Sequence, residues 1–163
     1  MHKRNAAAEV RTGRVSIVAF AAAYLAVSLI ATSPAAAFQL VTADEAALPP
    51  GTVPSFEVRG SPTRLPSITL VSPAGVGVLY SPIDLKLRFQ AFGGAAIDPE
   101  TVAVTYVKRP DIDITPRLKS FITASGIEIS KAELPPGVHE FWVQLKDTNG
   151  RMNGHEFKFQ VAK

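Results

Sequence analysis

The stretch that decides the fold class is residues 83–91, which read Ile-Asp-Leu-Lys-Leu-Arg-Phe-Gln-Ala. Apolar residues occupy its odd-numbered positions, and polar or charged residues occupy its even-numbered ones. Side chains of a β-strand alternate between the two faces of a sheet. The stretch therefore predicts a strand that buries one face and exposes the other.

Several other short segments carry strand patterns, separated by turn residues such as Gly93-Gly94 and Asp147-Thr148-Asn149-Gly150. These segments are residues 68–72, 101–108, 127–129, 138–146 and 157–161. Six or seven short strands with turns between them are typical of a β-sandwich or barrel. One shared core is expected to contain Phe89, Tyr106, Phe141, Leu145, Phe157 and Phe159.

One segment has a helical pattern instead. Leu118, Phe121 and Ile122 follow helical spacing, Thr115 is a candidate cap, and Pro116 suits the first helical position. We expect a helix of two or three turns that crosses from one sheet to the other.

The end of the chain supports a family resemblance. Residues 134–151 read LPPGVHEFWVQLKDTNGR, and the chain closes on the aromatic-rich residues 157–161. This pattern resembles the last strands of bacterial immunoglobulin-like and fibronectin type III-like domains. The resemblance covers about residues 66–163 and implies an all-β, immunoglobulin-like β-sandwich of about seven strands with one short helical insert. It implies no active-site residues, and the paired cysteines of antibody domains are absent because the chain has none.

The N-terminus has the pattern of a secretory signal peptide. Lys3, Arg4, Arg11 and Arg14 precede an apolar run over residues 15–30, and the run ends in Ser-Pro-Ala-Ala-Ala at residues 33–37. A retained membrane anchor is the alternative, but the run is shorter than the roughly 20 residues of a typical span. We therefore assign residues 1–37 to a signal peptide and expect the protein to be periplasmic or secreted.

The segment that follows, residues 38–66, is rich in proline and shows no sustained apolar period. It is interpreted as a linker or tail, and residues 67–163 as the domain. Within the linker, residues 55–59 alternate and are a candidate edge strand. The chain carries a net charge of +3, all of which comes from residues 1–37. A formally neutral mature protein lacks the positive field that nucleic-acid binding needs.

Groups that could carry chemistry are sparse. Without cysteine there is no thiolate chemistry, and the chain contains no Gly-x-Ser-x-Gly motif or glycine-rich phosphate loop. His139 and His155 flank the last hairpin and could hold zinc or copper, but no third ligand is evident. Asp147 and Asn149 resemble part of a calcium loop, although they are also ordinary turn residues. We expect no cofactor and no enzymatic activity.

Trp142 is the residue that points to a binding surface. Phe141, Val143 and Leu145 take the core face of their strand, so Trp142 must point outward. If this strand lies between residues 101–108 and the last strand, Trp142 shares a sheet face with Val107, Thr105, Gln144 and Lys158. An exposed tryptophan in a polar surround favours protein recognition. The alternative is that the linker or an edge strand covers the indole.

The sequence thus predicts an exported binding or adaptor module of unknown specificity, whose partner is another periplasmic or envelope protein. The alternative is a small-ligand or metal-handling protein that uses His139 and His155. Metal-dependent shifts in the NMR signals of the two histidines would favour the alternative.

Cleavage after Ala37 is directly measurable. Ala35 and Ala37 fit the small-residue requirement of signal peptidases, so the exported protein should begin at Phe38. Intact-mass spectrometry of the exported fraction checks this. A full-length species retained in the membrane would contradict it.

Overall fold

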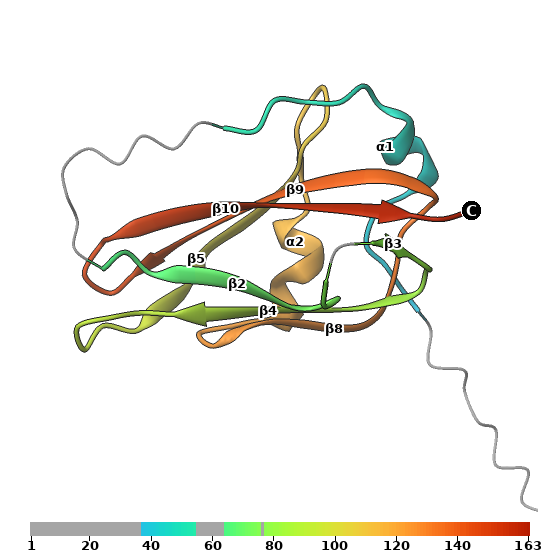
Figure 1. Cartoon of the computed structure of the whole chain (residues 1–163). Helices are drawn as coiled ribbons and strands as arrows, with labels where there is room; N and C mark the ends of the chain where they lie inside the picture. The colour runs from blue at the N-terminus through green and yellow to red at the C-terminus, as the bar shows by residue number, and fades with distance from the viewer. Residues whose placement is uncertain (1–36, 55–63, 76) are drawn as a thin grey trace, which may run out of the picture. The chain divides into compact units, whose positions relative to one another are not determined.

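The computed structural model of the chain describes residues 37–54, 64–75 and 77–163 (Figure 1). The elements run in this order: β1 (Phe38–Gln39), α1 (Ala43–Ala47), β2 (Ser67–Ser72), β3 (Val78–Leu79), β4 (Ile83–Gln90), β5 (Ile97–Tyr106), β6 (Ile112–Asp113), α2 (Thr115–Leu118), the 3-10 turn η1 (Lys119–Phe121), β7 (Ile122–Thr123), β8 (Gly126–Glu133), β9 (Gly137–Asp147) and β10 (Met152–Val161). The described domain is thus mostly β, as the sequence predicts.

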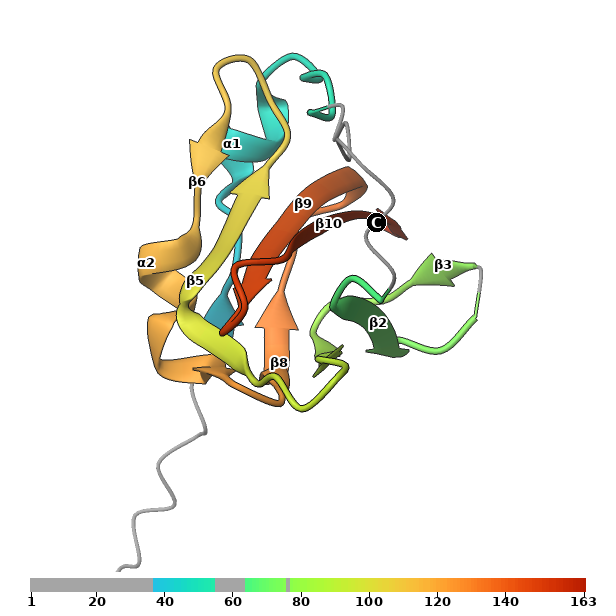
Figure 2. The ribbon, with the colours of Figure 1, turned by 90° about the vertical axis from the view of Figure 1, so that its left-hand side faces the viewer.

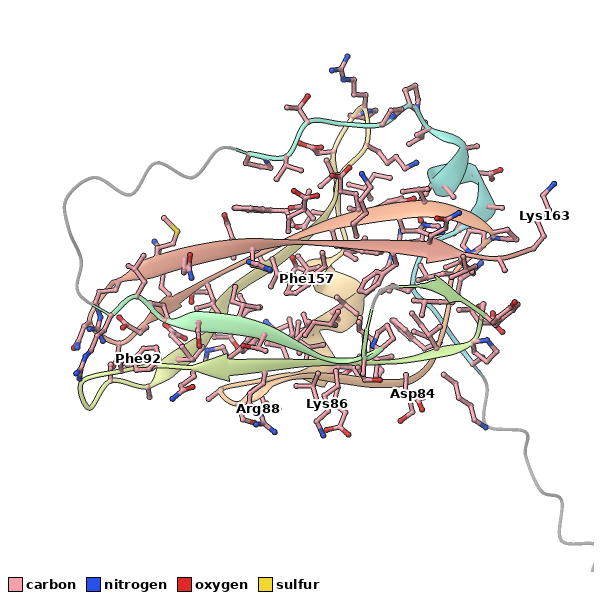
Figure 3. All side chains as sticks on the ribbon, in the orientation of Figure 1. Asp84, Lys86, Arg88, Phe92, Phe157 and Lys163 are labelled. Atoms are coloured by element: carbon pink, nitrogen blue, oxygen red, sulfur yellow. The ribbon has the colours of Figure 1, made fainter. Side chains whose placement is uncertain are left out.

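The first sheet, which we call sheet I, has the order β1-β8-β4-β2, with β7 also paired to β8. Strand β4, which the alternating residues 83–91 predict, lies between β8 and β2, and its residues alternate between buried and more exposed positions without a break. The pairs β2–β4 and β4–β8 are antiparallel, whereas β1 is parallel to β8. Figure 3 shows Asp84, Lys86 and Arg88 of β4 pointing away from the second sheet.

The second sheet, sheet II, has the order β3-β10-β9-β5-β6. Strand β9 lies between β10 and β5 and is antiparallel to both. Strand β3 is only two residues long and is parallel to β10. Figure 1 shows sheets I and II as two layers, and Figure 2 shows β6 beside β5 at the outer edge of sheet II.

The core lies between these layers. All six residues predicted to share it are buried in one hydrophobic cluster, and Phe157 points between the sheets in Figure 3. Strand β9 contributes Phe141, Val143 and Leu145 to this cluster, in phase with the period of two. The in-and-out assignment made from the sequence is therefore correct for this strand.

The predicted helical connection is present but shorter than expected. Helix α2 and the turn η1 together lead from β6 of sheet II to β7 of sheet I. Thr115 does not cap the helix, because the N-cap position is Ile114. Instead, the Thr115 hydroxyl accepts a hydrogen bond from the Val104 backbone N–H at 2.9 Å. Among the described residues, neither helix is long and apolar enough to cross a membrane.

The linker interpretation of residues 38–66 is wrong for their first half. Strand β1 pairs with β8, and Leu40 and Val41 are each only 1% exposed within the core. Helix α1 begins with a capping box in which Thr42 and Glu45 bond each other's backbone N–H. Residues 55–63, which include the candidate edge strand, lie outside the described residues.

Lys108 fastens this N-terminal segment to sheet II. Its ammonium donates to the carbonyl oxygens of Ala46 at 2.8 Å and Leu48 at 3.1 Å, in the last turn and at the C-cap of α1. It also lies 5.2 Å from the centre of the Tyr106 ring, a cation–π distance. A buried ammonium is costly unless its donors are bonded, so these contacts explain how Lys108 tolerates being only 8% exposed.

Backbone pairing and an ion pair complete the attachment. Pro50 forms an antiparallel bridge with Lys108, and the Arg109 N–H donates to Pro49 O at 3.0 Å. Arg117 of α2 pairs with the Glu45 carboxylate, with Nη1 and Oε2 2.9 Å apart. This hydrogen bond lowers the pKa of Glu45 to about 2, against the opposing effect of burial. Residues 38–51 are therefore part of the domain.

The corrected boundary predicts a stability effect. Leu40→Ala removes a buried side chain and should lower the free energy of unfolding by about 2–5 kcal/mol. The control is Val71→Ala, because Val71 is an exposed strand residue. Urea titration of both variants tests this. A loss no larger for Leu40→Ala than for Val71→Ala would mean that the segment is a dispensable tail.

Candidate functional site

The residues predicted to form a binding surface do share one face of sheet II. Trp142 is paired with Thr105 of β5 on one side and with Glu156 of β10 on the other. Gln144 lies opposite Ala103, and Lys158 lies opposite Glu140, so the expected order of the three strands is correct. These side chains face away from the core.

The expected exposure of Trp142 is wrong. Its side chain is only 7% exposed, and Val107 is 1% exposed. The indole lies over Gly154 of β10: a Cβ placed on Gly154 would be 2.2 Å from Trp142 Cζ2. Val107 contacts the N-terminal segment, since a Cβ on Gly51 would be 2.9 Å from Val107 Cγ1. The centre of this face is therefore packed: Trp142 lies on its neighbouring strand β10, and Val107 contacts the N-terminal segment.

The accessible part of this face is charged. Glu156 lies beside Glu140. A hydrogen bond in which the protonated Glu156 carboxyl group donates to Glu140, together with burial and the Glu140 charge, raises the pKa of Glu156, and the Lys158 charge opposes this shift. The Lys158 ammonium is 4.0 Å from the Glu140 carboxylate. Thr105, Gln144 and Lys158 thus surround a packed indole, and Trp142 cannot act as an exposed anchor for a partner.

The two histidines are not brought together. His139 is paired with Phe159 and His155 with Val143, so they lie four positions apart along the same two strands. At about 3.4 Å per residue this is roughly 14 Å. His139 also points into the core, whereas His155 is exposed beside Phe157. Among the described residues, no group of three potential metal ligands is present.

His139 is held in a buried hydrogen-bond chain. Its Nε2 is 2.7 Å from the carbonyl oxygen of Pro135, which can only accept, so Nε2 carries the hydrogen. Nδ1 then accepts from the Tyr106 hydroxyl at 3.0 Å. Burial lowers the pKa of His139, opposed by the Pro135 bond and assisted by the Lys108 charge. Burial, followed by the charge of Glu45, raises the pKa of Tyr106 to about 12.

In the acidic turn that resembles a calcium loop, the Asp147 carboxylate forms hydrogen bonds within the turn itself. Asp147 Oδ1 accepts from the backbone N–H groups of Asn149 and Arg151, at 3.0 and 2.9 Å. Its Oδ2 pairs with Arg151 Nε at 2.6 Å. Although burial raises the pKa of Asp147, these bonds and the Arg151 charge lower it overall. The turn interpretation is therefore correct.

Sequence reasoning missed an exposed apolar cluster around β3. Val78, Tyr80 and Val138 are exposed by 50%, 75% and 52%. Gln160 is paired with both Val78 and Val138, so these two valines flank it in one row on the outer face of sheet II. Single exposed apolar residues are ordinary, whereas clusters mark interaction sites.

A groove lies beside this cluster, and we call it the β3 groove. It has a volume of about 310 Å³ and is bounded by β2, by the connection that follows it, and by β10. Leu70, Leu79 and Phe159 line it with apolar surface, and Val138, Lys158 and Gln160 line it from the outer face of sheet II. Its size falls at the lower end of the range for ligand sites. Lys158 is the predicted site residue that reaches this groove.

Comparison of the chain with protein-family models, with curated proteins and with solved structures finds no significant match. The assignment of a function therefore depends on the geometry of the molecule itself.

The packing of Trp142 on Gly154 predicts a double-mutant effect. Gly154→Ala should destabilise the protein, because its Cβ collides with the indole. In the Trp142→Ala background the collision disappears, so Gly154→Ala should cost less there than in the wild type. Gly77→Ala is the control, with no atom within 4 Å of its Cβ. Urea unfolding of the wild type, the two single variants and the double variant measures the coupling. Equal costs of Gly154→Ala in both backgrounds would mean that the indole does not pack on Gly154.

The buried hydrogen-bond chain of His139 predicts that the protein loses stability in acid. The folded pKa of His139 lies below its unfolded value of 6.5, so below pH 6.5 the unfolded chain binds a proton that the folded one excludes. The free energy of unfolding should fall by up to about 1.4 kcal/mol per pH unit between pH 6.5 and 5, above the range where Glu45 titrates.

His139→Gln keeps a donor and an acceptor but cannot be protonated, so this slope should disappear in the variant. His155→Gln, at an exposed position, is the control and should retain it. Urea unfolding at several pH values is the measurement. An unchanged slope in His139→Gln would exclude His139 as its source.

Proposed function

We propose that this protein is an exported, non-enzymatic binding or adaptor module built on an immunoglobulin-like sandwich. The strand order supports the fold assignment. In immunoglobulin domains one sheet contains strands A, B and E, and the other contains G, F and C. Strands β2, β4 and β8 of sheet I occupy the first set of positions, and β10, β9 and β5 of sheet II occupy the second. Strands β1 and β7 stand beside β8, where strand D would pair.

Export is supported by the pattern of residues 1–37 and by the position of the domain. Phe38 opens β1, so cleavage after Ala37 would leave every helix and strand of the described domain in the mature chain. The proposed location is the periplasm or the extracellular space, and the proposed partner is another periplasmic or envelope protein.

The observation that carries the binding function is the exposed apolar surface beside the β3 groove, where Val78 and Val138 flank Gln160 and Tyr80 is exposed just after β3. Burying such side chains against a partner removes apolar surface from water and stabilises association. The charged and polar residues Lys158 and Gln160 border the cluster. An apolar centre with a polar border is the usual anatomy of a protein interface.

Site-specific photo-crosslinking in the native envelope tests this function. A benzophenone amino acid in place of Tyr80 should give an adduct with a partner protein. The matched control places it at Lys86, on the outer face of sheet I (Figure 3), where no adduct is expected. An adduct at Lys86 alone, or at neither position, would contradict the proposed surface.

A further inference from the structure

The two edges of β10 differ in how completely they are paired. On one side, β9 pairs with it from Met152 to Val161. On the other side, within the described part of the chain, β3 pairs with it only at Gln160 and Val161. Most of this second edge therefore has no described strand paired to it, and we call it the β10 edge.

The backbone direction identifies the groups that this edge presents. The Ala162 N–H donates to Leu79 O at 2.8 Å, so residue 162 directs its backbone groups toward β3. Successive residues of a strand direct these groups to opposite edges, and a residue bonds both groups to one neighbour. Glu156 and Lys158 therefore direct their N–H and C=O groups toward the β10 edge. Gly154 does the same, but its N–H is taken by the Asn153 side chain at 2.9 Å.

The β3 groove adjoins these backbone groups. Lys158, Phe159 and Gln160 of β10 all line it, and β3 ends beside it at Leu79. Strand β3 runs parallel to β10 and begins at Val78, opposite Gln160. A strand placed in line with β3, on the side that precedes Val78, would therefore pass along Lys158 and Glu156. Side chains on one of its faces would point to the apolar surface of Leu70, Leu79 and Phe159, because strand side chains alternate between faces.

We propose that an extended segment of the partner protein adds to sheet II at the β10 edge, in line with β3, by pairing with the backbones of Glu156 and Lys158. The proposal rests on the proposed function and names the chemistry of its partner. Main-chain hydrogen bonds provide affinity in this mode of recognition, and pockets for alternate side chains provide specificity. The segment has apolar residues at alternate positions, one of which fills the β3 groove.

The charge of Lys158 further restricts which side chains the added segment can carry. Among the described residues, Lys158 is the one charged residue that lines the β3 groove, and its side chain is 61% exposed. The side chains on the other face of the added strand therefore include a carboxylate opposite Lys158. Opposite charges on directly paired residues stabilise a sheet, and like charges destabilise it.

A second copy of this chain does not fit the same edge. Two-fold antiparallel pairing with Glu156 opposite Lys158 of the second copy would place Gln160 opposite the second copy's Gly154. The edge of Gln160 is already filled by β3. The added strand must therefore come from a segment without an obstructing neighbour, such as an extended terminus or loop of the partner.

A tethered strand tests the proposal without knowledge of the partner. A seven-residue segment in which valine alternates with glutamate and threonine is fused to Lys163 through a flexible glycine-serine linker of about ten residues. The C-terminus lies beside β3, so the linker holds the segment near the edge at an effective concentration of the order of millimolar. Amide hydrogen exchange of Glu156 and Lys158 is then measured by NMR.

Exchange at both amides should slow at least tenfold relative to a fusion of the same composition with consecutive valines. Val138→Asp, in the groove lining, should abolish the effect, whereas Val71→Asp, on an exposed strand position outside the lining, should not. Unchanged exchange, or equal slowing by both fusions, would overturn the proposal. Slow exchange in the protein without a fusion would also overturn it, because residues 55–63 or a second copy would then occupy the edge.

Strand addition and the binding function can be tested separately. A crosslink at Tyr80 without protection of Glu156 and Lys158 by the tethered strand would leave the binding function intact and exclude strand addition.

Discussion

The rest of this structure depends on the pairing of β9 with β5 and β10 at the same time. Because β9 is bonded on both sides, its register is fixed, and each of its side chains is committed to one face. One face carries His139, Phe141, Val143 and Leu145 into the core, and the other places Trp142 over Gly154. A one-residue slip would exchange these faces. Because the side chains of β9 are committed to packing, this strand offers little surface to a partner. The proposed binding surfaces are therefore the β10 edge and the residues around β3.

The N-terminal segment completes the same sheet by a different kind of interaction. Residues 38–51 provide little regular pairing, and they are held by Leu40 and Val41 in the core, by the bonds of Lys108 and by the Glu45–Arg117 pair. Lys108 and His139 both approach Tyr106, so the charge of one bears on the protonation of the other. The attachment of the segment and the neutral state of His139 are in this way parts of one buried polar cluster.

Much of the β architecture could be predicted from the sequence, because period-two patterns report directly which face a residue takes. The same parity would place His139 in the core, in phase with Phe141. The capping box at Thr42 and Glu45 was a readable helix signal within the proline-rich segment. The burial of Trp142 could not be predicted, because it depends on having glycine at position 154 of the neighbouring strand. The carbonyl partners of Lys108 are equally a product of contacts distant in sequence.

The central claim is that β10 carries a bonded edge and an open edge, and amide hydrogen exchange along β10 in the unmodified protein tests it most directly. The amides of Phe157 and Phe159, directed toward β9, should exchange slowly, because a bonded amide exchanges only when the structure opens. Those of Glu156 and Lys158 should exchange faster by about a hundredfold or more. The expected result is slow amide exchange at Phe157 and Phe159 that alternates with fast exchange at Glu156 and Lys158. Uniformly slow exchange from residue 156 to residue 159 would contradict it.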